Sequence, residues 1–260
     1  LLFLDKNARE SFQVAKVDDL TAWRESRTAV TGTLSAEDVS ANEWNFTVGP
    51  GTDLFRKLQE MPAKLGDITE KISQGIRTSA NDVYVLDILK MTGDAITASS
   101  EQQREVELER ATISFFLQGR EIKPYQILHS GKCVILPYQI RQGRAILLSK
   151  QEFQEQYPNT FAYLSDNKQR LENREKGRMK GPGWYGYVYP KNLELMASPK
   201  ILVPDIASRA SFALDEKGQY AFTSGYGITL KDKTQESVYY TLGLLNSKIL
   251  DFYLKKISTT

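Results

Sequence analysis

Hydrophobic and polar residues alternate along several short stretches of this chain, and a period of two predicts strands with one buried face. Turn-forming residues, such as Gly143 and the Lys217-Gly218 pair, favour hairpin connections between such stretches. The sequence therefore predicts strands at residues 12–17, 64–76, 83–86, 132–138, 145–148 and 200–204, and a hairpin over residues 211–222.

Two other regions carry apolar residues at helical spacing. Thr52 can cap a short helix after the turn at residues 49–51. Ser149 can cap a second helix, which restarts at Pro158 because proline is well tolerated in a first turn. Its continuation is expected to bury the stripe Phe161, Leu164 and Leu171 and to turn four cations mostly toward solvent: Lys168, Arg170, Arg174 and Lys176.

Two further helices are expected from the spacing of apolar residues. Residues 101–118 form the first, which Gly119 is placed to stop, and residues 236–256 form the second, interrupted near Asn246. Because strands and helices follow one another in a mixed order, the sequence predicts an α+β fold rather than a regular βαβ winding.

The composition is that of a globular protein, with 41% hydrophobic and 25% charged residues among 260. The longest apolar runs have only a few residues, far short of the roughly 20 that cross a bilayer. The single cysteine, Cys133, excludes an internal disulfide, and with the single histidine, His129, it excludes a Cys/His zinc cage. A reducing compartment is the default. The chain begins Leu-Leu-Phe-Leu, so we expect a fragment of a longer protein.

The net charge of +2 is too small to indicate nucleic-acid binding by itself, but the charge is unevenly distributed. Residues 168–180 hold six cations against two acids, a net charge of +4, whereas residues 101–109 hold four glutamates and one arginine. One face of the folded chain can therefore be basic although the total is close to neutral.

Few residues suggest catalysis. Asp205, Asp215 and Lys217 follow the order of a metal-dependent nuclease motif, in which carboxylates hold a divalent ion and a lysine steadies the attacking hydroxide. The same residues are ordinary in a hairpin turn, which we consider the better interpretation. His129 lies in a loop without triad partners, and Cys133 is expected to be a small core residue.

A clearer signal is the basic stretch that runs into an aromatic one. The cations of residues 170–180 are followed by Trp184, Tyr185, Tyr187 and Tyr189 on a glycine-hinged segment. Lysine and arginine neutralise phosphates, while aromatic rings can stack on bases or fill a groove. Two alternatives stay open: a solvated helix beside an aromatic core, or a protein-interaction module in which the Trp184 loop contacts another subunit.

The chain resembles the TaqI-like C-terminal specificity domain, or target-recognition domain, of type IIG restriction-modification enzymes and adenine-N6 DNA methyltransferases. The likeness extends over roughly residues 60–260, and its motifs occur in the family's order. They are an opening strand at 65–68, a G-x-x-T-x-x-N loop at 75–81, an L-x-G-x-x-I-x-x-Y segment at 117–125, and shorter matches at 157–164, 171–174, 184–185, 198–206 and 244–248.

The resemblance implies a sequence-specific double-stranded DNA-binding module with mixed, mostly antiparallel sheets and packed helices. Residues 1–50, with a strand at 1–6, would be the trailing edge and linker of an absent methyltransferase domain, and residues 51–260 the target-recognition domain, whose C-terminal edge is expected to be missing. The Asn/Asp-Pro-Pro-Tyr motif and the glycine-rich S-adenosylmethionine loop are absent from the sequence, so this part is expected to be non-catalytic. S-adenosylmethionine, and magnesium if the parent cleaves, are expected in the missing domains. The expected partners are duplex DNA and the in-chain methyltransferase domain, in the cytoplasm of a bacterium or archaeon.

The DNA-contacting residues expected from this resemblance and from the charge pattern fall into three groups. The phosphate clamps are Lys168, Arg170, Arg174, Arg178 and Lys180. Candidates for phosphate or base-edge contacts are Arg77, Thr78, Asn81, Arg120, Lys123 and Arg209, and residues that shape the groove-facing surface are Trp184, Tyr185 and Tyr187.

Overall fold

The computed structural model describes residues 6–7, 9–39, 46–101, 104–129 and 131–258. The chain forms two compact units, the first from residues 1–64 and 248–260 and the second from residues 65–247. The boundary expected near residue 50 therefore falls inside the first unit. Most of the strand expected at residues 1–6 lies outside the described ranges. No helix among the described residues is both long and apolar enough to span a membrane.

The first unit contains a two-stranded antiparallel sheet, β1 (Ser11–Lys16) with β2 (Val30–Ser35), which confirms the strand expected at 12–17. Helix α1 (Leu20–Ser26) lies between them in sequence and is not predicted by the pattern of apolar residues. The Asp19 side chain accepts the first-turn N–H groups of this helix, as an N-cap residue does. A short 3₁₀ turn, η1 (Ala36–Asp38), follows β2.

The first unit also contains α2 (Thr52–Gln59) and α10 (Lys248–Ile257), which meet through the stacked rings of Phe55 and Tyr253 with centroids 5.4 Å apart. The helix expected after residue 51 is confirmed, but the cap is wrong. Gly51 is the N-cap residue, with φ of 86°, and a Cβ there would lie 2.8 Å from the Phe252 ring. The Thr52 hydroxyl instead donates to the Gly49 carbonyl at 2.7 Å.

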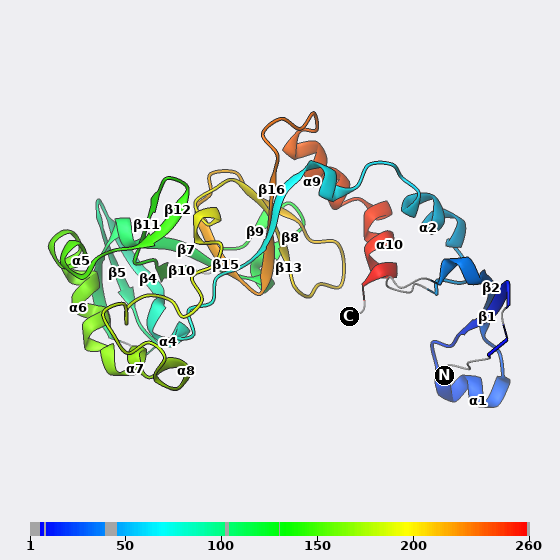
Figure 1. Cartoon of the computed structure of the whole chain (residues 1–260), viewed down its shortest axis with the longest axis horizontal. Helices are drawn as coiled ribbons and strands as arrows, with labels where there is room; N and C mark the ends of the chain where they lie inside the picture. Colours follow the sequence, from blue (N-terminus) through cyan, green and yellow to red (C-terminus); the bar gives the residue numbers. More distant parts are fainter. Residues whose placement is uncertain (1–5, 8, 40–45, 102–103, 130, 259–260) are drawn as a thin grey trace. The chain divides into compact units, whose positions relative to one another are not determined.

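A six-stranded sheet forms the larger part of the second unit (Figure 1). Its strand order is β15-β7-β10-β4-β5-β6, antiparallel throughout except for the parallel pair β15–β7. The core of the unit lies largely on this sheet. The strands are β4 (Val85–Thr92), β5 (Ala95–Ser99), β6 (Glu105–Glu109), β7 (Ile113–Gln118), β10 (Lys132–Ile135) and β15 (Tyr220–Thr223).

A four-stranded antiparallel sheet of order β14-β13-β16-β3 and two small ribbons, β8–β9 and β11–β12, complete the strands of the second unit. The α+β fold with mixed, mostly antiparallel sheets is thus confirmed. The bounds are β3 (Thr69–Gln74), β8 (Ile122–Lys123), β9 (Gln126–Ile127), β11 (Tyr138–Arg141), β12 (Arg144–Leu147), β13 (Lys200–Pro204), β14 (Ala213–Asp215) and β16 (Gly225–Leu230).

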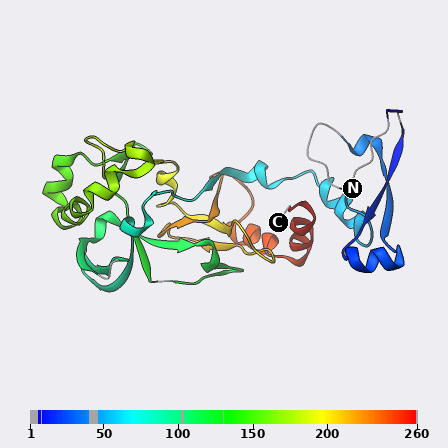
Figure 2. The same ribbon diagram turned by 90° about the horizontal axis from the view of Figure 1, so that it is seen from below.

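The helices α5 to α8 gather at one end of the second unit, as the two views in Figure 1 and Figure 2 show. The Ser149 cap, the restart at Pro158 and the break of the last helical stretch near Asn246 are all confirmed. The bounds are α3 (Leu65–Ile68), α4 (Asn81–Tyr84), α5 (Lys150–Gln156), α6 (Pro158–Asp166), α7 (Lys168–Glu172), α8 (Arg174–Gly177) and α9 (Val238–Leu245), with 3₁₀ turns η2 (Arg110–Thr112), η3 (Gly119–Glu121) and η4 (Leu193–Leu195).

The helix expected at residues 101–118 is wrong, because the chain forms β6, η2 and β7 there. Glutamates alternate with Val106 and Leu108 along β6, so the period is two, and Leu108 is fully buried. Gly119 does not stop a helix. It lies where a Cβ would come within 2.1 Å of the Ser224 carbonyl oxygen, so the close approach of the backbone requires glycine.

Two of the expected strands also differ from the structure. Residues 211–222 are not a hairpin, because β14 pairs with β13 in one sheet while β15 pairs with β7 in the other. The strand expected at 64–76 begins as helix α3 and becomes β3 only at Thr69. In β3 the buried residues are Thr69 and Ser73, whereas Ile72 is half exposed, so the apolar alternation does not mark the buried face.

One acidic side chain of β6 caps a neighbouring helix. The two carboxylate oxygens of Glu109 accept the backbone N–H groups of Asn159 and Thr160, each at 2.8 Å, in the first turn of α6. The Thr160 hydroxyl donates to the same carboxylate at 2.6 Å. A carboxylate at a helix N-terminus satisfies free donors and complements the helix dipole.

We therefore expect Glu109→Ala to lower the free energy of unfolding by about 1–2 kcal/mol, the usual effect of losing a helix cap. Urea denaturation monitored by circular dichroism measures the change. Glu107→Ala, on the same strand but with an exposed side chain, is the matched control and is expected to change stability by less than about 0.5 kcal/mol. Equal stability of the two variants would contradict the capping role.

Candidate nucleic-acid interface

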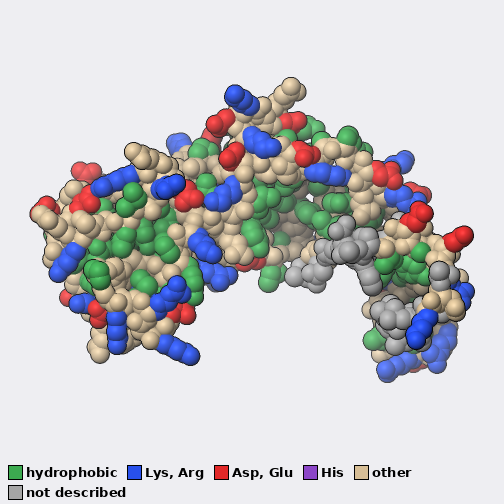
Figure 3. Space-filling view, viewed as in Figure 1, with side chains coloured by type: hydrophobic (Ala, Val, Ile, Leu, Met, Phe, Trp, Pro, Cys, Tyr) green, Lys and Arg blue, Asp and Glu red, His purple; other side chains and the backbone are tan. Residues whose placement is uncertain are grey.

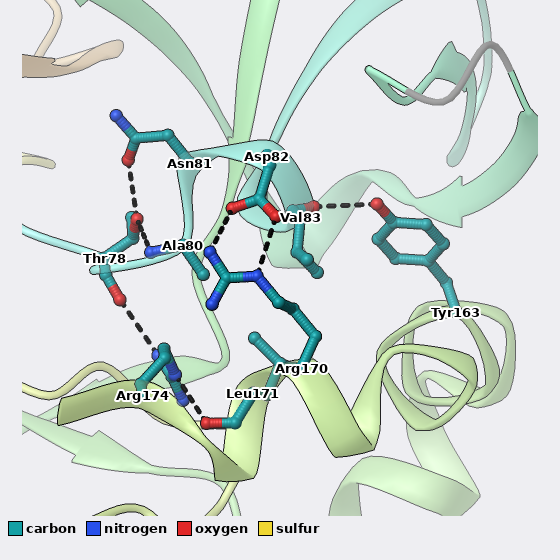
Figure 4. Close-up of polar contacts among 9 residues, drawn as sticks. All are labelled: Thr78, Ala80, Asn81, Asp82, Val83, Tyr163, Arg170, Leu171 and Arg174. Carbon is teal, nitrogen blue, oxygen red and sulfur yellow. Dashed lines mark hydrogen bonds and ion pairs between the residues drawn. The ribbon is translucent and has the colours of Figure 1, made fainter. Parts of the chain in front are cut away.

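A buried arginine at the start of α8 organises the candidate interface. Arg174 is only 2% exposed, so the expectation that it faces solvent is wrong. Its guanidinium donates to four backbone carbonyls in three chain segments, two of which appear in Figure 4. These carbonyls belong to Leu171 at 2.8 Å, Thr78 at 2.9 Å, Trp184 at 2.7 Å and Gly186 at 2.8 Å.

The ring of Tyr84 completes the surroundings of this guanidinium. Arg174 lies 5.4 Å from the ring centroid, a cation–π distance. The Tyr84 hydroxyl donates to the carbonyl of Tyr185 at 2.9 Å, and burial raises the pKa of this phenol well above its ordinary value. Arg174 and Tyr84 together fix the aromatic segment 184–186 against the loop at residues 76–82.

That loop is held by its own side chains. Thr78, itself buried, donates its hydroxyl to the side-chain oxygen of Asn81 at 2.6 Å and accepts the Ala80 N–H at 3.0 Å (Figure 4). Before it, a Cβ on Gly75 would lie 2.2 Å from the Phe222 carbonyl oxygen. The G-x-x-T-x-x-N pattern therefore has a structural explanation: the glycine allows close backbone contact, and the threonine and asparagine lock a turn.

A hollow of about 430 Å³ opens beside this loop, lined by residues 76–82 with Arg170 and Thr223. Arg170 reaches across from α7 to Asp82 and makes a two-pronged ion pair, with N···O distances of 3.1 and 3.2 Å (Figure 4). Arg77 and Asn81 are exposed at the hollow. The structure thus brings together four of the expected site residues: Arg77, Asn81 and Arg170, which are exposed, and Thr78, which is buried.

Further cations continue the basic surface along the chain after α7. The Arg178 guanidinium stacks over the ring of Tyr189 at 5.6 Å, and Tyr189 in turn forms an antiparallel bridge with Arg77. Lys168 lies 5.8 Å from the Trp184 ring and pairs with Glu172 at 3.7 Å. Lys and Arg side chains project from the surface over α7 and α8 (Figure 3).

The backbone that presents these cations is strained. Glu175 and Lys176 are left-handed, with φ of 48° and 60°, and Gly177 follows with φ of 87°. Left-handed backbone costs a non-glycine residue roughly 1–2 kcal/mol. The kink comes directly after Arg174, and Arg178 follows it and contacts Tyr189.

The expected groove-facing aromatics are in the core instead. Trp184, Tyr185 and Tyr187 are each no more than 5% exposed. The Tyr185 hydroxyl donates to the backbone carbonyl of Leu148 at 2.7 Å, and the Tyr187 hydroxyl donates to the backbone carbonyl of Ile135 at 2.5 Å. These rings support the surface from below, and the core interpretation of the aromatic segment is correct. Tyr189, at 37% exposed, is the aromatic residue of this segment that reaches the surface.

The remaining expected site residues lie on other elements. Arg120 is exposed on η3, Lys123 is exposed on β8, and Arg209 is exposed on the loop between β13 and β14. None of the three lines the hollow at residues 76–82. Lys180, also exposed, follows the strained turn after α8. Tyr189 was not selected from the sequence, although its position as the last of the aromatic run before Pro190 was a signal for exposure.

The alternative nuclease site is not assembled. Asp215 is buried and pairs with Lys200 at 2.6 Å, and it also accepts the backbone N–H groups of Gln219 and Tyr220. Burial lowers the pKa of Lys200, and the Asp215 carboxylate opposes that shift. Asp205 and Lys217 are exposed, and the described residues contain no cluster of three metal-ligating side chains.

Comparison with known proteins gives one family and several relatives. The family model of the TaqI-like C-terminal specificity domain matches residues 114–260. The chain is 24% identical over 270 aligned positions to the type II restriction enzyme and methyltransferase RM.Eco57I of Escherichia coli, covering 97% of this chain and 27% of that protein. It is 27% identical to the type II methyltransferase M.BanIII of Aneurinibacillus aneurinilyticus, and 26% identical to M.XhoI of Xanthomonas vasicola, covering in each case 69% of this chain and 29% of the relative. This chain thus spans less than a third of these relatives.

We expect Arg174→Met to lower the free energy of unfolding by about 3–5 kcal/mol, because four buried carbonyl groups lose their donor. Chemical denaturation measures this loss. Arg178→Met, a change of the same kind at an exposed arginine, serves as control and is expected to stay within about 0.5 kcal/mol of the parent chain. If the two variants unfold at the same denaturant concentration, Arg174 does not hold the interface together.

We expect Asp215→Ala to cost about 3–5 kcal/mol as well, since Lys200 would remain buried without its carboxylate. Lys217→Ala, the adjacent exposed member of the nuclease motif, should leave the unfolding midpoint unchanged. If the unsubstituted chain cleaves plasmid DNA in the presence of magnesium, and Lys217→Ala abolishes that cleavage, the nuclease interpretation is supported instead.

Proposed function

This chain belongs to the TaqI-like C-terminal specificity domain family, and from that premise we propose that it binds double-stranded DNA sequence-specifically for an adenine-N6 methyltransferase of a restriction-modification system. The observation that carries the proposal is the basic surface around the hollow at residues 76–82. Exposed cations from two distant parts of the chain meet there on a frame that Arg174 fixes from inside.

We assign phosphate contacts to the exposed cations in α7 and in the segment that follows it. Lys168, Arg170, Arg178 and Lys180 present positive charge along one stretch of surface. Their present partners are weak competitors, because an exposed ion pair such as Arg170 with Asp82 contributes only about 0–1 kcal/mol. A DNA phosphate can therefore replace the Asp82 carboxylate on Arg170 at small cost, and the same two-pronged geometry suits both anions.

Base-edge contacts are assigned to the hollow itself. Arg77 and Asn81 are exposed there, and these residue types read guanine and adenine through paired hydrogen bonds in the major groove. Asn81 is already oriented, because its side-chain oxygen accepts the Thr78 hydroxyl and its amide nitrogen points away from Thr78 (Figure 4). An oriented side chain loses less entropy when it binds. Arg120, Lys123 and Arg209 remain candidates for contacts further along the duplex.

Catalysis belongs, in this proposal, to the part of the relatives that this chain does not match. Methyl transfer needs S-adenosylmethionine, and cleavage by a restriction enzyme needs a metal such as magnesium. The target adenine has to leave the base stack before its amino nitrogen can be reached. The specificity domain would hold the duplex in register beside the methyltransferase domain while that occurs, and it requires neither cofactor for binding.

The proposal predicts salt-dependent duplex binding. We expect the logarithm of the association constant for a short duplex to fall linearly with the logarithm of salt concentration, because phosphate contacts release counterions. Arg178→Ala should weaken binding to all duplexes about equally and reduce the slope by about 1. Fluorescence anisotropy at several salt concentrations measures both quantities.

The matched control is Lys233→Ala, which removes an exposed cation from the loop before α9. It should change neither affinity nor slope. A parent chain whose duplex binding does not depend on salt, or two variants that weaken binding equally, would refute this surface as the phosphate-contacting one.

A further inference from the structure

The β11–β12 ribbon is a small two-stranded sheet of its own that projects from the second unit (Figure 1). Four residue pairs join its strands, ending with Arg141 opposite Arg144. The turn between them consists of Gln142 and Gly143, both with positive φ, at 51° and 73°. This two-residue turn matches the right-handed twist of the strands, so the tip continues the ribbon without a flexible loop.

The base of the ribbon is fixed in the core. The Tyr138 hydroxyl accepts the backbone N–H of Tyr187 at 2.6 Å, and burial raises the pKa of Tyr138 to about 12. Tyr138, Ala145 and Leu147 all pack on the core, and by the register they share one face with Ile140. The other face, which we call the arginine face, carries Gln139, Arg141, Arg144 and Ile146.

On the arginine face, two positive charges, those of Arg141 and Arg144, lie opposite each other at the tip of the ribbon. A cross-strand pair of like charges is destabilising, and no carboxylate bridges this one. Arg141 is steadied at one side, by the Gln139 side chain at 2.9 Å and the Glu152 carboxylate at 2.5 Å. Arg144 is exposed, and its side chain makes no hydrogen bond or ion pair within the described part of the chain. The Glu152 carboxylate compensates one of the two like charges, whereas that of Arg144 has no such partner among the described residues, and a local rule of sheet stability that is broken in this way is typical of a site built for binding.

We infer that the arginine face of the β11–β12 ribbon is a second DNA-contacting element, which enters the major groove and reads guanine through Arg144. This inference rests on the proposed function. The major groove is about 12 Å wide and admits a two-stranded ribbon, as it admits a helix. The Arg144 guanidinium lies at the ribbon tip, and Glu152 holds the opposite Arg141 in place. Arg144 can therefore approach the O6 and N7 acceptors of guanine directly.

The residue chemistry favours DNA over a protein surface. The centres of protein interfaces combine arginine with aromatic residues and methionine, whereas the ribbon tip consists of two arginines, a glutamine and a glycine, with no aromatic or methionine side chain. Gln142 at the turn adds a side chain that pairs with adenine in the same groove. No residue of the ribbon lines the hollow at 76–82, so base contacts by Arg144 would be additional to those assigned to that hollow.

The test is selection from a randomised duplex library by the full chain, followed by sequencing and by anisotropy on the selected and on a scrambled duplex. Arg144→Ala is expected to lower affinity for the selected duplex by about 5- to 150-fold, the usual range for one paired base contact, and to erase a guanine preference at one position. Arg144→Lys keeps the charge but lacks the paired N–H donors of the guanidinium. It should therefore lose the same guanine preference and bind the scrambled duplex with the affinity of the unsubstituted chain. Lys233→Ala is the control for loss of an exposed cation.

The outcomes separate this inference from the proposed function. If the parent chain selects no sequence and binds without salt dependence, the proposed function itself fails. If the parent selects a sequence and Arg144→Ala selects the same one with unchanged preference, only the ribbon inference is overturned. Equal losses by Arg144→Ala on the selected and scrambled duplexes would also overturn it, since they would make Arg144 a phosphate contact. Thermal melting of both variants, expected to match the parent, excludes unfolding as the cause.

Discussion

A buried guanidinium that donates to four backbone carbonyl groups is the constraint on which this architecture depends. Because Arg174 is buried, its N–H groups need acceptors from the protein itself. The acceptors are backbone carbonyls at the end of α7, in the loop before α4 and in the aromatic segment after the strained turn. A charge so placed would be costly if any of these acceptors moved away, so the three segments hold one another in position. The exposed cations around the hollow owe their geometry to this hidden one.

The residues that carry the family likeness are mostly structural. Gly75 and Gly119 stand where the backbone approaches carbonyls of Phe222 and Ser224 too closely for a Cβ. Asn246 at the end of α9 clasps residue 212, accepting the Phe212 N–H and donating to its carbonyl, each at 2.9 Å. Such positions define a scaffold, whereas Arg77 and Arg144 have exposed side chains.

Local chemistry made part of this fold predictable. A serine cap, a proline in a first turn and a period of two in residues 12–17 each act within a few residues, and each was confirmed. The failures arose where distant partners decide. Residues 101–118 were assigned to a helix because burial on both faces of β7 hides the strand period. Arg174 was placed in solvent because a buried arginine is detectable only from its acceptors, which lie up to 96 residues away in sequence. The aromatic segment was correctly singled out, but its rings were wrongly expected on the surface. A sequence does not distinguish a ring that packs beneath a surface from one that lies on it.

The path of the chain between β13 and β16 has a consequence for how specificity can be exchanged among relatives. The chain leaves the four-stranded sheet after β14, supplies β15 to the edge of the six-stranded sheet beside β7, and returns as β16. Neither sheet is therefore a continuous piece of sequence, and a crossover inside this region would pair strands from two different parents in both sheets. Exchange of residues 65–247 as a whole, or of a ribbon tip alone, would keep the strand pairs of both sheets from one parent. New specificities would then arise either by exchange of complete modules or by single substitutions on a fixed frame.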